Sequence, residues 1–72
     1  MKKESVHNCV SQLRVRHNIT QEELAKKVNV SRQTIIAIEK GDYVPSVLLA
    51  LKISRYFKCQ VEKIFSVSKK YE

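Results

Sequence analysis

The chain has 72 residues, of which 43% are hydrophobic, and its 14 Lys and Arg against 7 Asp and Glu give a formal charge of +7 at neutral pH. A single Gly and a single Pro at this apolar content favour a compact helical protein over a disordered one. The length predicts one domain, residues 1–72, with a small core that pairing can stabilise, and the charge suits a polyanion, nucleic acid before an anionic membrane surface.

Other function classes are disfavoured by the absence of their sequence signals. The N-terminus lacks the apolar segment of a signal peptide and no run is long enough to span a membrane, so a cytoplasmic location is expected. Cys9 and Cys59 are isolated, and His7 near Cys9 leaves a zinc ion short of ligands, so core thiols are favoured over a metal or redox role. His7 and His17 lack acidic neighbours and no Gly-rich phosphate loop occurs, so neither an enzyme nor a cofactor is expected.

The first predicted helix spans about Ser5 to His17, after a frayed lead-in over residues 1–4. Basic residues at its C-terminal turn complement the helix dipole, and Asn18 is suited to ending it. Helical spacing predicts an inward face of Val6, Cys9, Val10 and Leu13.

Residues 20–40 predict two short helices joined by a tight turn. Thr20 and Glu23 have the spacing of a capping box, which starts a helix that runs to about Val28. Asn29 tolerates the left-handed conformation that ends a helix, and Ser31 caps a second helix that reaches about Lys40. The predicted inward residues are Leu24, Ala25 and Val28 in the first helix, and Ile35, Ile38 and Glu39 in the second.

Two such helices form a helix-turn-helix, whose second helix enters the major groove of DNA by its N-terminal end. Arg can bond guanine O6 and N7, and Gln can bond adenine N6 and N7. The predicted base-contacting residues are therefore Arg32, Gln33, Ile36 and Ala37, and the predicted phosphate-contacting residues are Gln21, Ser31, Thr34, Lys40 and Tyr43. Two alternatives stay open: Ile36 contacts a thymine methyl or packs sideways, and Thr34 caps locally or touches a phosphate.

The C-terminal half predicts two more helices. Gly41 suits the left-handed position after a helix, and Pro45 followed by Ser46 starts the next helix, which spans about Val47 to Lys58. Its predicted inward stripe is Val47, Ala50, Leu51 and Ser54, widened by Leu49, Ile53 and Phe57. Leu48 lies on the opposite face, either as a chance surface leucine or as the edge of a partner-binding patch.

A short helix is predicted from Gln60 or Val61 to Phe65. Its three apolar residues, Val61, Ile64 and Phe65, are more than one helical turn on the surface of a lone domain usually carries. The tail, residues 66–72, is either a frayed end or a short strand.

The run QEELAKKVNVSRQTIIAIEKGDYVPS resembles the helix-turn-helix of the lambda Cro/C1 (XRE-type) repressor family. With VSRQTI, IEKGDYVPS, LALKI and VEKIF in this order, roughly residues 10–66 are similar to small cytolysin-operon-repressor-like regulators. The resemblance implies an all-α, five-helix lambda-repressor-like fold and a buried Arg14–Glu39 bridge, with a free phosphate contact as the other reading of Arg14. It also implies a two-fold homodimer through residues 60–72, with Val61, Ile64, Phe65 and Val67 at the interface.

The expected function is therefore that of a sequence-specific regulator of transcription, a homodimeric repressor on an inverted-repeat operator of double-stranded DNA. No small-molecule ligand is expected. The alternatives are the DNA-binding antitoxin of a toxin–antitoxin pair, which a tightly co-purifying partner would indicate, and a protein-binding module without DNA contacts, which a gel shift would test.

Overall fold

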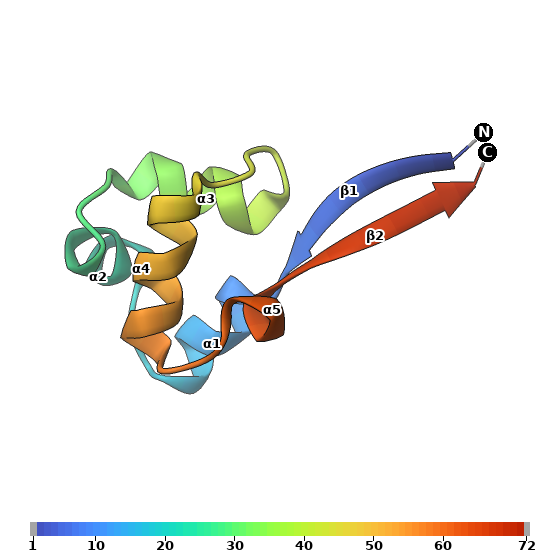
Figure 1. Cartoon of the computed structure of the whole chain (residues 1–72). Coiled ribbons are helices and arrows are strands. Elements are labelled where there is room, and N and C mark those ends of the chain that lie inside the picture. Colours follow the sequence, from blue (N-terminus) through green and yellow to red (C-terminus); the bar gives the residue numbers. More distant parts are fainter. Residues whose placement is uncertain (1, 72) are drawn as a thin grey trace.

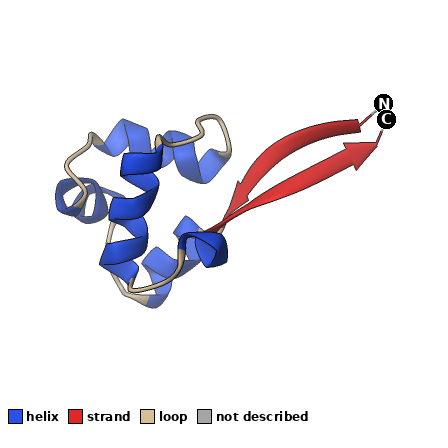
Figure 2. Ribbon diagram, viewed as in Figure 1, coloured by secondary structure: helices blue, strands red, loops and turns tan. Residues whose placement is uncertain are grey.

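The computed structural model describes the backbone of residues 2–71 and the side chains of residues 4–67. Helices and strands follow in the order β1 (Lys2–Asn8), α1 (Val10–Arg16), α2 (Gln21–Lys27), α3 (Arg32–Lys40), α4 (Val47–Phe57), α5 (Val61–Ile64) and β2 (Phe65–Tyr71). The helices gather into a bundle, while the two strands form a long ribbon that projects from it (Figures 1 and 2). The ribbon makes the molecule elongated, with extents of 39 × 23 × 22 Å.

The local signals predicted for residues 20–40 are present. The backbone N–H of Glu23 donates to Thr20 Oγ1 at 3.0 Å, and that of Thr20 donates to Glu23 Oε1 at 2.8 Å, which completes the capping box of α2. Asn29 is left-handed, with φ 61°, and the next N–H, of Val30, donates to Ala25 O at 2.9 Å. The turn thus ends α2 without glycine and sets the entry into α3.

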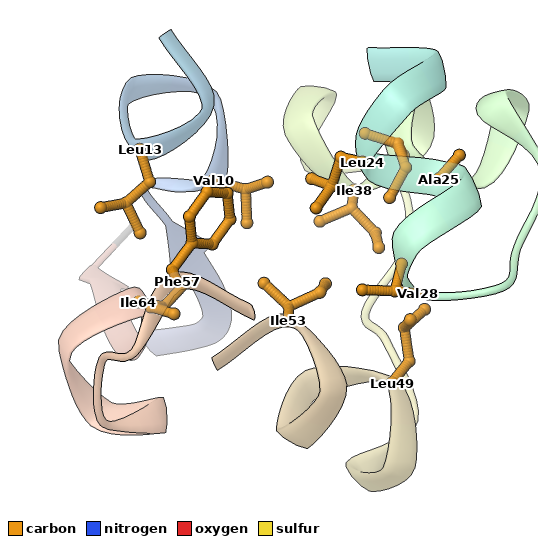
Figure 3. Packing of buried hydrophobic residues seen from close by; sticks show 11 residues of the cluster. Val10, Leu13, Leu24, Ala25, Val28, Ile38, Leu49, Ile53, Phe57 and Ile64 are labelled. Carbon is orange, nitrogen blue, oxygen red and sulfur yellow. The ribbon is translucent and has the colours of Figure 1, made fainter. Parts of the chain in front are cut away.

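All five helices of the described chain contribute to one core. Figure 3 shows these side chains converging between the helices, with Ile53 of α4 among them. Ile35, Ile38 and Ile53 are fully buried. Among residues 4–67, the buried apolar residues are Val10, Leu13, Leu24, Ala25, Val28, Ile35, Ile38, Leu49, Ile53, Phe57 and Ile64. Since Ile35 and Ile38 are turned into this core, the opposite face of α3 is left outside.

The predicted start of the first helix at Ser5 is wrong, because residues 2–8 form strand β1, whereas the later part of the predicted helix is confirmed as α1. This strand pairs antiparallel with β2 from the other end of the chain, with Val6 opposite Val67 and Asn8 opposite Phe65. Helix α1 begins only at Val10, whose N–H donates to Asn8 Oδ1 at 3.1 Å. The pairing satisfies the backbone groups of β1 that face β2, while those on its outer edge are left to water. The partner strand is too distant in sequence for local periodicity to predict it.

Two side chains placed inside that predicted helix have other surroundings. Val6 is half-buried on the ribbon. Cys9 is half-buried against the core, where its backbone N–H donates to Ile64 O at 3.0 Å and its thiol donates to Lys63 O at 3.4 Å. Residue 9 therefore joins the start of α1 to the end of α5.

Of the two alternatives for the tail, the strand is confirmed for residues 66–71, and residue 72 lies outside the described residues. The predicted end of the short helix at Phe65 is corrected, because α5 ends at Ile64 and Phe65 is already extended. In α4 the buried face contains Leu49, Ile53, Ser54 and Phe57, whereas Val47 and Leu51 are 77% and 46% exposed. A stripe through residues 49, 53 and 57 advances by whole turns of the helix, so it excludes residues 47 and 51. The two-stranded sheet likewise makes the predicted all-α class incomplete.

Candidate nucleic-acid interface

The outer face of α3 carries the side chains predicted to contact bases. Ser31 caps the helix by accepting from the N–H of Thr34 at 3.2 Å. Immediately after the cap, Arg32 and Gln33 are exposed. Ala37 lies one turn beyond Gln33 and is half-buried. Ile36 is also half-buried, outside the set of partly buried side chains that pack against the core.

An ion pair between α1 and α3 fixes the angle at which α3 is held. Arg14 Nε lies 2.8 Å from Glu39 Oε2, and Nη2 lies 3.3 Å from Oε1. The remaining Nη1 donates to Ile19 O at 3.1 Å, so the guanidinium is engaged within the protein rather than free for a phosphate. The side chains of Arg14 and Glu39 are 17% and 8% exposed, which limits screening by solvent.

Gln21 belongs to the same network. Its Nε2 donates to Glu39 Oε1 at 3.0 Å, and the side chain is half-buried at the start of α2. Glu39 therefore accepts from two other helices of the bundle, α1 and α2. The amide N–H₂ of Gln21 is partly used inside the protein, which leaves its carbonyl oxygen and second hydrogen for other contacts.

The other predicted phosphate-contacting residues lie around the same face. Thr34 Oγ1 and Ser31 Oγ are 3.0 Å apart, so the Thr34 hydroxyl takes part in the local cap. The Lys40 side chain is 68% exposed at the end of α3, with its Nζ 3.9 Å from Asp42 Oδ2. Tyr43 is 44% exposed in the loop that follows Gly41.

Two depressions border the exposed face of α3. One, of about 630 Å³, lies at its N-terminal end between α1 and α2 and is lined by Arg14, Val15, Asn18, Ile19, Thr20, Gln21, Glu22 and Arg32. The other, of about 280 Å³, lies between α3 and the following loop and is lined by Gln33, Thr34, Ala37 and Tyr43. Six of the nine predicted base-contacting and phosphate-contacting residues thus line these two depressions: Gln21, Arg32, Gln33, Thr34, Ala37 and Tyr43.

The four residues predicted for a dimer interface fall into different environments. Ile64 is 2% exposed and belongs to the core, so it has no surface to offer a second chain. Val61 and Phe65 are half-buried, and Val67 is 67% exposed on the ribbon. Sequence periodicity did not identify a group of exposed apolar residues in and just before α4, in which Val44, Val47, Leu48 and Leu51 are each at least 46% exposed. Leu48 in a polar face was the one signal for it.

Within the described part of the chain, no three His, Cys, Asp or Glu side chains are grouped so that they could hold a metal ion. None of the helices among residues 2–71 has the length and apolar character needed to cross a membrane.

The fold and the exposed face of α3 define a helix-turn-helix domain: a capped helix, a tight turn, and a second helix anchored by one face. A helix-turn-helix family model matches residues 10–64, and the chain belongs to that family. It is 59% identical over 58 residues to an HTH-type transcriptional regulator of Methanocaldococcus jannaschii, covering 81% of this chain and 88% of the relative. The HTH-type transcriptional regulator YgzD of Bacillus subtilis is 55% identical over 58 residues with the same coverage.

Proposed function

We propose that this protein is a DNA-binding transcriptional regulator, and that it acts as a homodimeric repressor on an inverted-repeat operator. One observation carries the proposal: α3 is fixed by Ile35, Ile38 and Glu39 while Arg32 and Gln33 project at its N-terminal end. That arrangement is suited to the major groove, where the N-terminal residues of a recognition helix reach base edges. The charge of +7 supports attraction to the phosphate backbone.

Base reading and positioning are divided between two sets of residues. Arg32 and Gln33 are the long, exposed donors that pair with guanine and adenine, while Ile36 and Ala37 offer apolar contact to the same groove. Phosphate contacts come from the residues around this face, namely Gln21, Ser31, Thr34, Lys40 and Tyr43. The first set determines which sequence is bound, and the second sets register and salt dependence.

The homodimer uses the C-terminal region. Val67 is exposed on β2, and Phe65 and Val61, which precede it in the chain, are half-buried. Ile64 lies in the core below this segment. A two-stranded ribbon is marginally stable unless something packs on it, which favours a second copy as its cover. A two-fold pair places its recognition helices about 34 Å apart, so half-sites are expected about 10 base pairs centre to centre.

Selection of bound sequences from random double-stranded DNA tests the DNA function directly. An enriched inverted repeat is the expected result, and recovery of random sequences would contradict the proposal. Arg32→Ala should then relax one position of each half-site and cost roughly 1–3 kcal/mol of binding. Lys40→Ala is the matched control, because loss of a phosphate contact weakens all sequences alike and lowers the salt dependence.

Sedimentation of two matched variants tests the dimer. Val67 and Val15 are both 67% exposed, but Val15 lies on α1, outside the proposed interface. Val67→Asp should give monomers because it buries a charge between the copies, whereas Val15→Asp should leave the dimer intact. A dimer that survives Val67→Asp would place the interface elsewhere.

One observation favours a second candidate, the DNA-binding antitoxin of a toxin–antitoxin pair. The exposed apolar residues Val44, Val47, Leu48 and Leu51 could receive a partner protein. A single partner that co-purifies with the chain and is lost in Leu48→Asp would support this candidate, and a chain that purifies alone would contradict it.

A further inference from the structure

The depression between α3 and the loop that follows it is mostly apolar, although it lies beside the exposed face of α3. Gln33, Thr34 and Ala37 line it from the exposed side of α3, and Tyr43 closes it from the loop. The loop is held there by two backbone hydrogen bonds: Gly41 N–H to Ile38 O at 3.0 Å and Asp42 N–H to Ala37 O at 2.9 Å. Gly41 has a φ of 81°, which lets the chain turn back at this point (Figure 1). Tyr43 is therefore positioned next to the recognition helix by the end of that helix itself.

The lining is apolar except at one point. The hydroxyl of Thr34 takes part in the local cap with that of Ser31, 3.0 Å away, and its methyl group is the apolar part that Thr34 can contribute. Ala37 contributes its methyl group and Tyr43 its ring, while the Gln33 amide supplies the polar group at the rim. With a volume of about 280 Å³ and an open, shallow form, the depression suits a small apolar projection rather than a protein helix.

The chemistry of the major groove identifies that projection. Base pairs present hydrogen-bond donors and acceptors there, and the one apolar group among them is the C5-methyl of thymine. Two exposed cations belong to the same helix as the depression's lining: Arg32 immediately precedes Gln33, and Lys40 lies about one turn beyond Ala37. Both would attract the phosphates that flank the base. An apolar depression near positive charge therefore suits the methyl group of a thymine in DNA.

We propose that Gln33, Thr34, Ala37 and Tyr43 form a subsite for the C5-methyl group of one thymine in each half-site. Tyr43 then determines specificity through its ring, while its hydroxyl remains available for the proposed phosphate contact. This subsite rests on the proposed DNA-binding function, and it assigns the methyl contact to α3 and the loop together rather than to Ile36.

Deoxyuridine substitution tests the subsite, because uracil differs from thymine only by this methyl group. Each thymine of the selected operator is replaced singly, and affinity is measured by fluorescence anisotropy. We expect one thymine in each half-site at which the wild-type protein loses about fourfold in affinity, the effect of one buried methyl group. In Tyr43→Ala the thymine-to-uracil ratio at that position should fall to about one, whereas Tyr43→Phe, the matched control, should keep it.

The outcomes separate the subsite from the function beneath it. If uracil is tolerated at every position, or if Tyr43→Ala leaves the ratio unchanged, the subsite is overturned while sequence-specific binding stands. If Tyr43→Ala and Tyr43→Phe both weaken all sequences equally and both leave the thymine-to-uracil ratio as in the wild type, Tyr43 acts only as a phosphate contact and the subsite is overturned. Failure of the wild-type protein to select any sequence would overturn the proposed function and the subsite together. The uracil scan needs only the wild-type protein, so it stands even if a Tyr43 variant folds poorly.

Discussion

The helical bundle and the terminal ribbon use opposite means to hold their shape. In the bundle, eleven apolar side chains are buried, and short-range caps begin α2, α3 and α4. In the ribbon none of the described side chains, residues 4–8 and 65–67, is fully buried, and the strands come from the two ends of the chain. The bundle is therefore stabilised by hydrophobic burial, while the ribbon depends on backbone hydrogen bonds exposed to water.

This difference bears on how the proposed DNA-binding face of α3 is kept in place. Helix α3, the proposed recognition helix, lies in the well-packed region, and a fixed orientation is needed if its side chains are to meet base edges. The ribbon is joined to that region by Asn8, whose Nδ2 donates to Ile38 O at 2.9 Å, at the end of α3. This hydrogen bond is a direct link through which a change in the ribbon could alter the position of α3, even though few ribbon side chains pack against the core.

The largest effect is expected from removing one partner of the ion pair in the bundle. Glu39→Ala leaves the half-buried Arg14 guanidinium and the Gln21 amide without their acceptor, which should lower the free energy of unfolding by about 3 kcal/mol. Urea denaturation measures this loss in the free energy of unfolding. Glu39→Gln is the control that keeps the shape and loses the charge. A loss below about 1 kcal/mol would mean that solvent replaces the pair.

The next largest effect is expected from a valine-to-alanine change in the bundle, which is compared below with the same change in the ribbon. Val10→Ala removes two methyl groups from a fully buried site, so we expect the free energy of unfolding to fall by about 2 kcal/mol. Thermal and urea denaturation report the loss. If Val10→Ala were as mild as a surface change, the bundle would be repacking around the cavity, and the contrast between bundle and ribbon would be weaker than stated.

A smaller effect is expected at the capping box. Thr20→Ala removes the hydroxyl that accepts from the N–H of Glu23, and should lower the free energy of unfolding by about 1 kcal/mol. Thr20→Ser, which retains the hydroxyl, should stay close to wild type. Equal losses in the two variants would assign the effect to the threonine methyl rather than to the cap.

The smallest effect is expected in the ribbon. Val67→Ala changes a side chain that is 67% exposed, so the free energy of unfolding should fall by less than about 0.5 kcal/mol. The measurement requires protein dilute enough to be monomeric, since a second copy would cover this valine in the proposed dimer. A loss as large as that of Val10→Ala under these conditions would show that the ribbon takes part in folding the bundle.

Local signals predicted the central part of the fold and much of the candidate site. The capping box at Thr20, the left-handed Asn29 and the cap at Ser31 each depend on residues a few positions apart, so the sequence alone predicts where α2 and α3 begin and end. The same periodicity assigns Ile35 and Ile38 to the core, which leaves Arg32 and Gln33 outside. These features need no knowledge of distant segments.

Only the tertiary structure decided the features that depend on distant segments. Residues 2–8 pair with residues 65–71, which outweighs the helical spacing of Val6 and Cys9. The packing of α4 determined that Leu49 rather than Val47 is buried, and the return of the loop put Tyr43 beside Ala37. Caps and helix faces are determined within one or two turns of chain, whereas strand pairing and grooves require backbones to meet in space, and short-range periodicity carries no information about that.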